Sequence, residues 1–252
     1  MAESRSVVKF CGVAGIALLA LTSGALAGGS LKDEPKPERE FTYSFTLTGT
    51  SDYMFRGISQ TDNEPAIQGS ANIGYGIFYA GIWASNVDFK DDAQIEIDYY
   101  AGIKPVWGKA TFDFGVLYYD YPSYDDLDDN EYLEIKAAVS GEIISNLTGT
   151  AAFYYSPDYN QKEYYVYEGT LAYALPQFHV FTPTISGQVG HYTWETVGVD
   201  YTYWNAGLSL AVEKLTFDFR YWDTDLDTSE CYSWSPDSCS ERFVFSATLA
   251  LP

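Results

Sequence analysis

The sequence predicts an all-β protein, a single 12-stranded antiparallel transmembrane β-barrel of the outer-membrane type, preceded by a cleavable signal peptide. Three observations predict this fold. The chain begins with an export signal, twelve stretches of about ten residues alternate apolar with polar residues, and 17% of the residues are aromatic, including 23 tyrosines. Strand side chains point alternately to opposite faces. A membrane barrel uses this alternation for an apolar outer face with aromatic girdles and a polar lumen.

The N-terminus has the parts of a signal peptide. Arg5 and Lys9 precede the apolar run Val13–Leu21, and Ala25 and Ala27 provide the small residues of a cleavage site. A membrane-anchoring helix is the alternative interpretation. Such a helix needs about 20 consecutive apolar residues, and this run is shorter.

The chain divides into three predicted parts. Cleavage after Ala27 leaves a charged stretch with prolines, which we expect to be disordered. The remainder alternates to the C-terminus and has the length of one barrel. The parts are a signal peptide over 1–27, a periplasmic lead-in over 28–40 and the barrel over 41–252.

The alternation predicts each strand in turn and is clearest in the first. There the odd positions begin with Phe41, Tyr43 and Phe45, whereas most even positions are threonine or serine. In Phe78–Val87 the phase is ambiguous, because both sets of alternate positions contain large apolar residues. The predicted strands are Phe41–Arg56, Ala66–Tyr75, Phe78–Val87, Ala93–Lys104, Ala110–Tyr119, Tyr132–Ser140, Leu147–Tyr155, Tyr164–Ala174, Val180–Gly190, Tyr201–Val212, Leu215–Trp222 and Arg242–Ala250.

The connections between these strands alternate in length. Outer-membrane barrels join their strands by short periplasmic turns and longer external loops. The pattern therefore predicts that both termini lie in the periplasm, as an even number of strands requires. The longer, external connections are Gly57–Pro65, Asp88–Asp92, Asp120–Glu131, Pro157–Glu163, His191–Asp200 and Asp223–Glu241.

Several motifs, in this order along the chain, resemble a known family. They are Ser51–Asp62 (SDYMFRGISQTD), Gly81–Val87 (GIWASNV), Glu96–Gly102 (EIDYYAG) and Phe112–Pro122 (FDFGVLYYDYP). Together they resemble the TorF-type porins, a proteobacterial outer-membrane family. The resemblance spans most of the mature chain. It implies an outer-membrane barrel with a role in transport, and it supplies no catalytic residues.

Charge excludes one class of partner. The formal net charge is −21, and it becomes −22 without the predicted leader, which carries one acid and two bases. Such a chain lacks the basic patches that neutralise nucleic-acid phosphates. A mean hydropathy of −0.16 suits a barrel whose polar lumen dilutes its apolar outer face. The expected partners are outer-membrane lipid, the barrel assembly machinery, and small solutes or ions, with no nucleic acid.

Charged side chains on the polar strand faces are the best functional candidates. A lysine or arginine facing lipid costs about 2–4 kcal/mol at the membrane midplane, so we expect these residues to line the lumen. They either line an open channel or fill it by pairing across it, and the sequence favours neither. Seven acids and four bases favour cations if a path is open. The candidates are Asp52, Arg56, Glu96, Asp98, Asp113, Glu134, Lys136, Glu168, Asp218, Arg220 and Arg242.

Two features belong to the external loops. Cys231 and Cys239 are predicted to form a disulfide, because export leads to an oxidising compartment. This bond would stabilise its short loop by about 2–3 kcal/mol. The runs Asp125–Asp129 and Asp223–Asp227 concentrate carboxylates. We interpret them as a solvated, repulsive surface, with divalent cations at these acidic loops as the alternative.

The sequence thus predicts a porin-like channel for passive diffusion of small hydrophilic solutes or ions through a narrow, charge-lined lumen, with no cofactor, metal or catalytic residues. A non-conducting structural or surface-interaction barrel is one alternative. An outer-membrane hydrolase is another, and it needs a serine or an aspartate within hydrogen-bond reach of a histidine. Ser186 and Glu195 lie near His191, but Ser186 and His191 have opposite phase.

Overall fold

The computed structural model of the chain describes residues 40–122, 131–160, 162–195, 198–231, 235 and 237–252. The predicted signal peptide and residues 28–39 of the predicted lead-in lie outside the described residues, and so does the acidic run Asp125–Asp129. Within the described ranges, no helix has the length and apolar character needed to cross a membrane.

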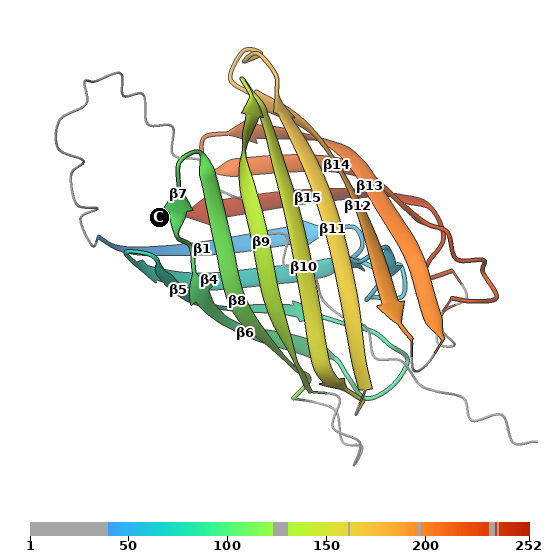
Figure 1. Cartoon of the computed structure of the whole chain (residues 1–252). Coiled ribbons are helices and arrows are strands. Elements are labelled where there is room, and N and C mark those ends of the chain that lie inside the picture. The colour runs from blue at the N-terminus through green and yellow to red at the C-terminus, as the bar shows by residue number, and fades with distance from the viewer. Residues whose placement is uncertain (1–39, 123–130, 161, 196–197, 232–234, 236) are drawn as a thin grey trace, which may run out of the picture.

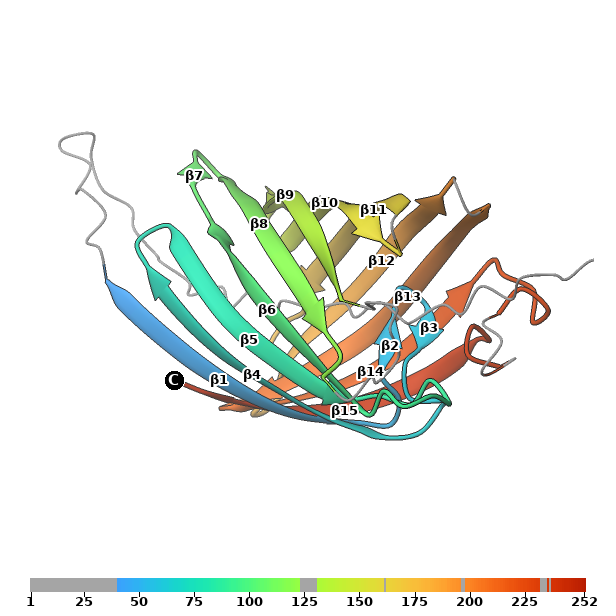
Figure 2. The ribbon, with the colours of Figure 1, turned by 90° about the horizontal axis from the view of Figure 1, so that it is seen from below.

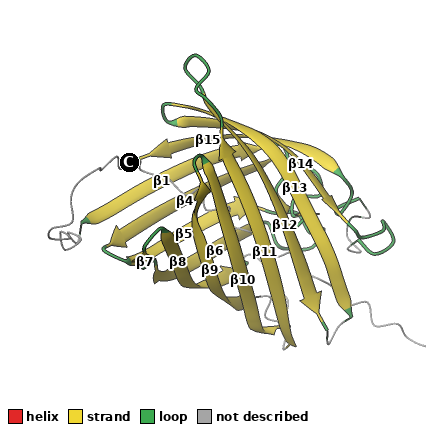
Figure 3. Cartoon of the chain, turned by 45° about the horizontal axis from the view of Figure 1, so that its top comes forward, coloured by secondary structure: helices red, strands yellow, loops and turns green. Residues whose placement is uncertain are grey.

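Twelve strands form a closed antiparallel barrel, which confirms the predicted fold (Figures 1 and 3). Each wall strand pairs with the next one along the chain, and β1 also pairs with β15, which closes the ring. Closure leaves no unpaired strand edge in contact with lipid. The wall strands are β1 (Phe41–Thr50), β4 (Ala66–Tyr75), β5 (Phe78–Asn86), β6 (Ile95–Ile103), β8 (Ala110–Asp120), β9 (Tyr132–Ile144), β10 (Leu147–Tyr159), β11 (Lys162–Ala174), β12 (Thr182–Trp194), β13 (Val199–Val212), β14 (Leu215–Thr224) and β15 (Arg242–Leu251), and the short β7 (Val106–Trp107) pairs with the start of β8.

The alternating pattern sends large apolar side chains to the outer face. Leu47 and Ile67 are both strongly exposed on this face. The structure also resolves the ambiguous phase of β5. Ile82 faces outward, whereas Trp83 and Ser85 are buried inside the barrel, where the Trp83 ring packs on an aromatic ring of the lumen.

Two connections predicted to be long loops are short turns. β10 continues to Tyr159 and β11 begins at Lys162, and these two residues pair across the hairpin. Proline cannot donate to a strand ladder and is tolerated at irregularities. Pro157 lies where the pairing register shifts, between Ser156 and Tyr159, so the strand continues past it. The β12–β13 hairpin is likewise longer than predicted and pairs up to Trp194.

The largest departure from the prediction follows β1. This strand ends at Thr50 instead of Arg56, and residues 51–65, the inward segment, fold into the barrel instead of forming an external loop (Figure 2). Its strands β2 (Met54–Phe55) and β3 (Ile58–Ser59) pair only with each other among the described strands. All of residues 52–61 are buried. The alternation of the first predicted strand continues without a break to Arg56, so the sequence pattern predicts a wall strand there.

A tight turn at the tip of the inward segment carries Arg56 into the lumen. Arg56 and Gly57 have φ values of 46° and 82°. A two-residue hairpin of type I′ requires positive φ at both of these positions. Gly57 is also needed for a close approach, since a Cβ there would overlap Thr224 and would lie 2.8 Å from Cβ of Tyr203. The turn therefore rests on the inner face of β13 and β14.

The loop between β14 and β15 supports the inward segment. Cys231 and Cys239 form the predicted disulfide in this loop, with their Cα atoms 5.5 Å apart. The backbone N–H of Ser59 donates to the Ser238 carbonyl at 2.8 Å, and the Thr224 hydroxyl donates to the Cys239 carbonyl at 3.1 Å. The disulfide thus constrains a loop that holds the inward segment.

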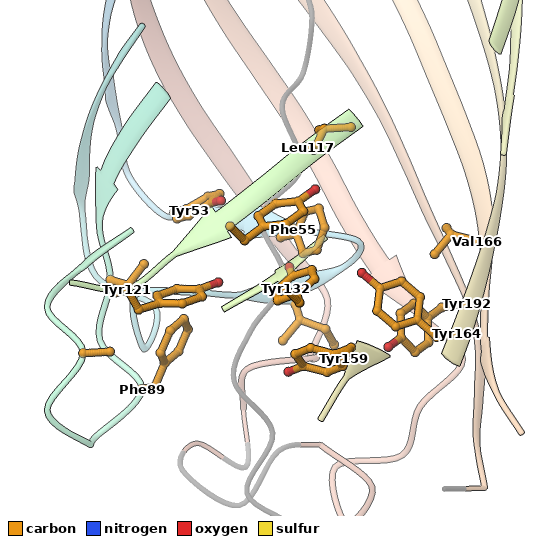
Figure 4. Close-up of a cluster of buried hydrophobic side chains, with 14 of the residues drawn as sticks. Tyr53, Phe55, Phe89, Leu117, Tyr121, Tyr132, Tyr159, Tyr164, Val166 and Tyr192 are labelled. Carbon is orange, nitrogen blue, oxygen red and sulfur yellow. The ribbon is translucent and has the colours of Figure 1, made fainter. Parts of the chain in front are cut away.

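The aromatic residues form two populations, not only the predicted girdles. Trp107 and Phe243 are more than 80% exposed on the outer face. By contrast, Tyr164 and Tyr203 are fully buried inside the barrel, within a cluster of rings to which the inward segment contributes Phe55 (Figure 4). Tyrosine serves both places because its ring is apolar and its hydroxyl binds polar partners. The girdle interpretation was therefore incomplete.

Candidate functional site

The lumen has two halves of different character. We define the loop end as the end of the barrel that carries the inward segment, and the terminal end as the end at Phe41 and Leu251. In the loop half, inward-facing residues such as Glu134 are fully buried. In the terminal half, inward-facing polar side chains remain partly exposed, as at Asp218. The inward segment thus closes the loop end, and the terminal half stays open to solvent.

A buried ion pair joins the tip of the inward segment to the barrel wall. A terminal guanidinium nitrogen of Arg56 lies 2.7 Å from Oε1 of Glu134 on β9, and both side chains are almost fully buried. The Tyr164 hydroxyl donates to the same oxygen at 2.5 Å, and the Tyr119 hydroxyl donates to Oε2 at 2.8 Å. Glu134 is therefore the centre of this group, where it accepts two tyrosine hydrogen bonds and holds Arg56 by charge.

Aromatic rings surround the rest of this guanidinium. Its central carbon lies 4.5 Å from the ring centre of Phe55 and 5.0 Å from that of Tyr154. A desolvated cation–π contact contributes about 2 kcal/mol. Burying two charges costs several kcal/mol per ion, which only good geometry and further hydrogen bonds repay. Loss of either charged partner would therefore leave a buried, uncompensated ion.

The acidic wall of β6 contacts another part of the inward segment. Glu96 and Asp98 are two residues apart on the inner face of β6, and both are fully buried. The Tyr53 hydroxyl lies 3.5 Å from Oε1 of Glu96, and the Tyr53 ring packs against Trp83 with centres 5.2 Å apart. These carboxyl groups therefore face the closure instead of an open path.

A second ion pair holds the base of the inward segment. A terminal nitrogen of Arg242, the first residue of β15, lies 2.9 Å from Oδ2 of Asp52. The hydroxyls of Ser59 and Thr61 donate to Oδ1 of Asp52 at 2.7 Å and 3.0 Å. Arg242 also contacts the side chain of Asn63. Asp52 and Arg242 thus serve to anchor the segment.

Inward-facing rings from neighbouring strands line the loop half beneath the closure. The Tyr119 and Tyr132 rings stack with centres 4.4 Å apart, and Tyr164 and Tyr192 lie 5.0 Å apart. Such pairs add about 0.5–1.5 kcal/mol each beyond the burial of their area. The arc runs from β8 to β13 and consists of Tyr119, Tyr132, Tyr159, Tyr164, Tyr192, Trp194, Tyr201 and Tyr203. Figure 4 labels four of them, Tyr132, Tyr159, Tyr164 and Tyr192.

In the terminal half, one carboxylate lies near two lysines. Oδ2 of Asp113 on β8 lies 2.9 Å from Nζ of Lys136 and 3.8 Å from Nζ of Lys104. The Tyr79 hydroxyl donates to Oδ1 at 2.7 Å. Partial burial lowers the pKa of Lys104, Asp113 opposes this effect, and the Lys136 ammonium lowers the pKa again. The positive charge of Lys104 is thus poorly compensated.

A second polar group spans β12, β13 and β14. Arg220 contacts Asp218 through Nε and a terminal nitrogen, both at 3.0 Å. Its other terminal nitrogen donates to Asn205 at 2.6 Å, and Ser186 accepts a further bond at 2.9 Å. All three guanidinium nitrogens of Arg220 therefore have partners.

The structure brings most of the predicted lumen residues into pairs. Four acid–base contacts use eight of the eleven, namely Asp52–Arg242, Arg56–Glu134, Asp113–Lys136 and Asp218–Arg220. Within the described ranges, three acids have no basic side chain within ion-pair distance, namely Glu96, Asp98 and Glu168. Glu168 instead accepts a hydrogen bond of 2.5 Å from the Tyr203 hydroxyl.

The predicted lumen residues did not include Lys104, although it lies on the polar row of its predicted strand, or the hydroxyls of the lumen tyrosines. The alternation phase of each strand shows which residues share its inward-facing row, and it identifies these side chains. Tyr119 shares the inward row of Asp113 on β8, and Lys104 continues the row of Asp98 one residue beyond β6. A tyrosine on a polar row is ambiguous in sequence, because it fits an apolar core as well as a hydrogen-bonded lumen.

Ser186 and His191 do not meet, although His191 forms an aspartate–histidine pair with Asp200. His191 faces Thr202 at 3.3 Å and Asp200 at 3.2 Å on the outer side of β12. Ser186 lies on the inner side, where Arg220 donates to its hydroxyl. Within the described part of the chain, no three histidine, cysteine or acidic side chains are arranged as metal ligands.

The fold is shared with solved porins. The KdgM porin aligns with a TM-score of 0.57 at 8% identity, covering 83% of this chain and 99% of its own, and its complex with disordered oligogalacturonate gives the same values. The NanC porin aligns with a TM-score of 0.52 at 12% identity over 82% of this chain and 99% of its own. No curated protein matches this sequence.

The family assignment rests on the sequence itself. Residues 33–249 match the model of the Gcw_chp family, which is described as bacterial proteins of unknown function. The match includes every wall strand of the barrel except the last residues of β15. The chain belongs to the Gcw_chp family.

Proposed function

We propose that this protein is a porin-like channel of the bacterial outer membrane that small hydrophilic solutes or ions cross by passive diffusion. The observation that carries the proposal is a solvent-open, charge-lined terminal half of the lumen that ends at a closure made by one short segment. The fold shared with porins and the resemblance to TorF-type porins support it. The short turns at the terminal end support a periplasmic location for both termini.

The inward segment acts as the closure in this proposal. Several polar contacts attach it to the wall and to the disulfide loop, among them Arg56–Glu134, Asp52–Arg242 and the Ser59–Ser238 backbone bond. The Tyr53 ring also packs against Trp83. Its two strands form no ladder with a wall strand among the described residues. A segment whose strands are not part of the wall ladder can move away without opening the barrel wall.

The charge of the open half does not support the expected preference for cations. Four of the seven predicted acids lie in the closed half, including Glu96, Asp98 and Glu134. Among the predicted lumen residues and Lys104, those in the terminal half and at its boundary are three acids and three bases, namely Asp113, Glu168, Asp218, Lys104, Lys136 and Arg220. We therefore propose that selectivity depends on the local arrangement of these charges.

Two other functions remain as competing proposals. A non-conducting structural or surface-interaction barrel is favoured by the complete burial of the loop half. A hydrolase would have to use the His191–Asp200 pair on the outer side of β12, because Ser186 lies on the opposite face of that strand. Divalent cations at the acidic external loops stay a prediction, as does assembly by the barrel assembly machinery.

Conductance in planar bilayers tests the proposal. The wild type is compared with a variant in which a glycine–serine linker of the same length replaces residues 53–61. A control carries the same kind of replacement at residues 176–180, in a turn at the terminal end. Heat-modifiable migration on gels verifies that each barrel has folded. We expect rare or small openings in the wild type and in the control, and large steady conductance in the linker variant.

Reduction of the Cys231–Cys239 disulfide in the wild-type protein provides a milder test of closure by the inward segment. Reduction should loosen the β14–β15 loop and raise the open probability of the wild type. If the folded wild type and the folded linker variant both pass neither ions nor small sugars, the channel proposal is wrong. Equal, large conductance in both would keep the channel and reject the inward segment as its closure.

A further inference from the structure

Lys104, Lys136 and Asp113 form a charged group of the terminal half in which bases outnumber acids. The two ammonium groups approach the same carboxylate oxygen, Oδ2 of Asp113, at 3.8 Å and 2.9 Å. The side chain of Lys104 is 36% exposed, and those of Lys136 and Asp113 are 14% and 12% exposed. Two cations with one anion leave one positive charge in excess at a site that solvent reaches.

The carboxylate is already occupied by its stronger partners. The Tyr79 hydroxyl donates to Oδ1 at 2.7 Å, and Lys136 donates to Oδ2 at 2.9 Å. Lys104 lies beyond hydrogen-bond distance of this oxygen, and its ammonium instead lies 4.6 Å from the Tyr79 ring centre. The ammonium therefore retains donors for another acceptor.

Arg220 provides the contrast within the same half of the lumen. Asp218 neutralises its charge, and Asn205 and Ser186 accept its remaining hydrogen bonds. An anion would have to displace these partners to bind there. At Lys104 no such displacement is needed.

We propose that Lys104 and Lys136 form a binding site for a small organic or inorganic anion that carries a carboxylate or phosphate group. The site deepens the proposed channel function by naming a solute class. Charge-assisted hydrogen bonds from two ammonium groups attract such an anion, and partial exclusion of water strengthens them. Asp113 keeps the binding weak, and a solute that binds weakly can also leave, as conduction requires.

Binding is measured without any need for conduction. The lysines of the detergent-solubilised full-length protein are reductively dimethylated with carbon-13, which preserves their charge. Phosphate and succinate are then titrated separately at constant ionic strength, with chloride as the balancing salt. We expect the Lys104 and Lys136 signals to shift saturably, while exposed Lys109 and Lys214 stay unchanged. A succinate-only response would identify carboxylates as the ligand, and a phosphate-only response would identify phosphates.

Matched variants locate the site. Lys104→Gln should abolish the saturable shift of Lys136, whereas Lys109→Gln should leave it unchanged. Asp113→Asn removes the competing carboxylate and should tighten binding about fivefold, because one charge at this distance contributes roughly that factor in water. The proposal is overturned if all lysines respond alike, if none responds, or if Lys104→Gln leaves the Lys136 titration unaltered. Anion binding without conductance would reject the channel and keep the site.

Discussion

The two halves of the lumen are built from the same wall strands and differ in what fills them. In the loop half, ion pairs and tyrosines are sealed beneath the inward segment, and Glu134 is fully buried. In the terminal half, the wall carries similar residues, but Asp218 and Lys104 remain in contact with solvent. The comparison indicates that a lumen charge is buried where the inward segment covers it and stays partly exposed where the segment does not reach.

The same difference changes the energetic weight of an ion pair. Arg56 and Glu134 are almost fully buried, and removing one partner of such a pair costs about 3–5 kcal/mol. The side chains of Asp218 and Arg220 are 20% and 18% exposed, so solvent screens this pair and moves its contribution towards the roughly 0–1 kcal/mol of a fully exposed pair. The following predictions test this contrast, beginning with the largest effect.

Glu134→Ala should have the largest effect. It leaves the Arg56 guanidinium buried without its carboxylate and frees two tyrosine hydroxyls, so we expect a loss of about 3–5 kcal/mol. The matched change in the terminal half, Asp218→Ala, should cost only about 1 kcal/mol. Urea unfolding in lipid vesicles, followed by tryptophan fluorescence, measures both.

Equal losses at these two positions would contradict the contrast between the halves. If the inward segment escapes instead of the barrel unfolding, Glu134→Ala should expose residues 51–65 to proteolysis while the barrel keeps its heat-modifiable migration. The double change Arg56→Met with Glu134→Leu removes both charges together and should recover most of the lost stability, because no unpaired ion remains.

A glycine pair tests how tightly the loop half is packed. Gly190 on β12 faces the lumen, and a Cβ there would overlap the buried Tyr203 ring, whose hydroxyl is held by Glu168. Gly190→Ala should therefore cost about 1–3 kcal/mol. Gly169 on the adjacent strand has no atom within 4 Å of such a Cβ.

We expect Gly169→Ala to be neutral or slightly stabilising, since alanine reduces the freedom of the unfolded chain. The same vesicle unfolding assay compares the two variants. A loss of stability at Gly169→Ala as large as that at Gly190→Ala would show that backbone effects, and not packing around Tyr203, limit the loop half.

The smallest effect is expected at the solvent-exposed edge of the closure. Nζ of Lys90 lies 2.6 Å from Asp62 and 2.9 Å from Asp88. Partial burial raises the pKa of Asp62, but hydrogen bonds from Lys90 and Ser235 outweigh it and lower the pKa overall. A lowered carboxyl pKa stabilises the closed segment above the ordinary aspartate value of about 3.9. This contribution disappears as the pH falls through the lowered value.

Asp62→Asn should therefore weaken closure at neutral pH by less than about 1 kcal/mol and should have no effect in strong acid. Hydrogen exchange of residues 52–61 is measured in the wild type and in Asp62→Asn from neutral pH to strong acid. It gives the difference in the stability of closure between the two proteins at each pH. A difference that grows as the pH falls would have the wrong sign for this pair.

Much of the fold was predictable because lipid and water impose opposite demands on the two faces of each strand. The alternation predicted twelve strands, their antiparallel order and the inward placement of Asp113, Lys136 and Asp218. The disulfide between Cys231 and Cys239 followed from export and cysteine count. These features depend on local patterns, which sequence reading detects.

The sequence by itself determined the closed barrel, because nearly every strand carries one apolar and one polar row of side chains whatever its neighbours are. Only the tertiary structure decided that β1 stops at Thr50 and that residues 51–65 turn inward. Tyr53 and Phe55 satisfy the alternation equally well in a wall strand and in a packed closure. The choice depends on contacts with Glu134, Tyr203 and Ser238, which are distant in the chain and meet only when the ring closes.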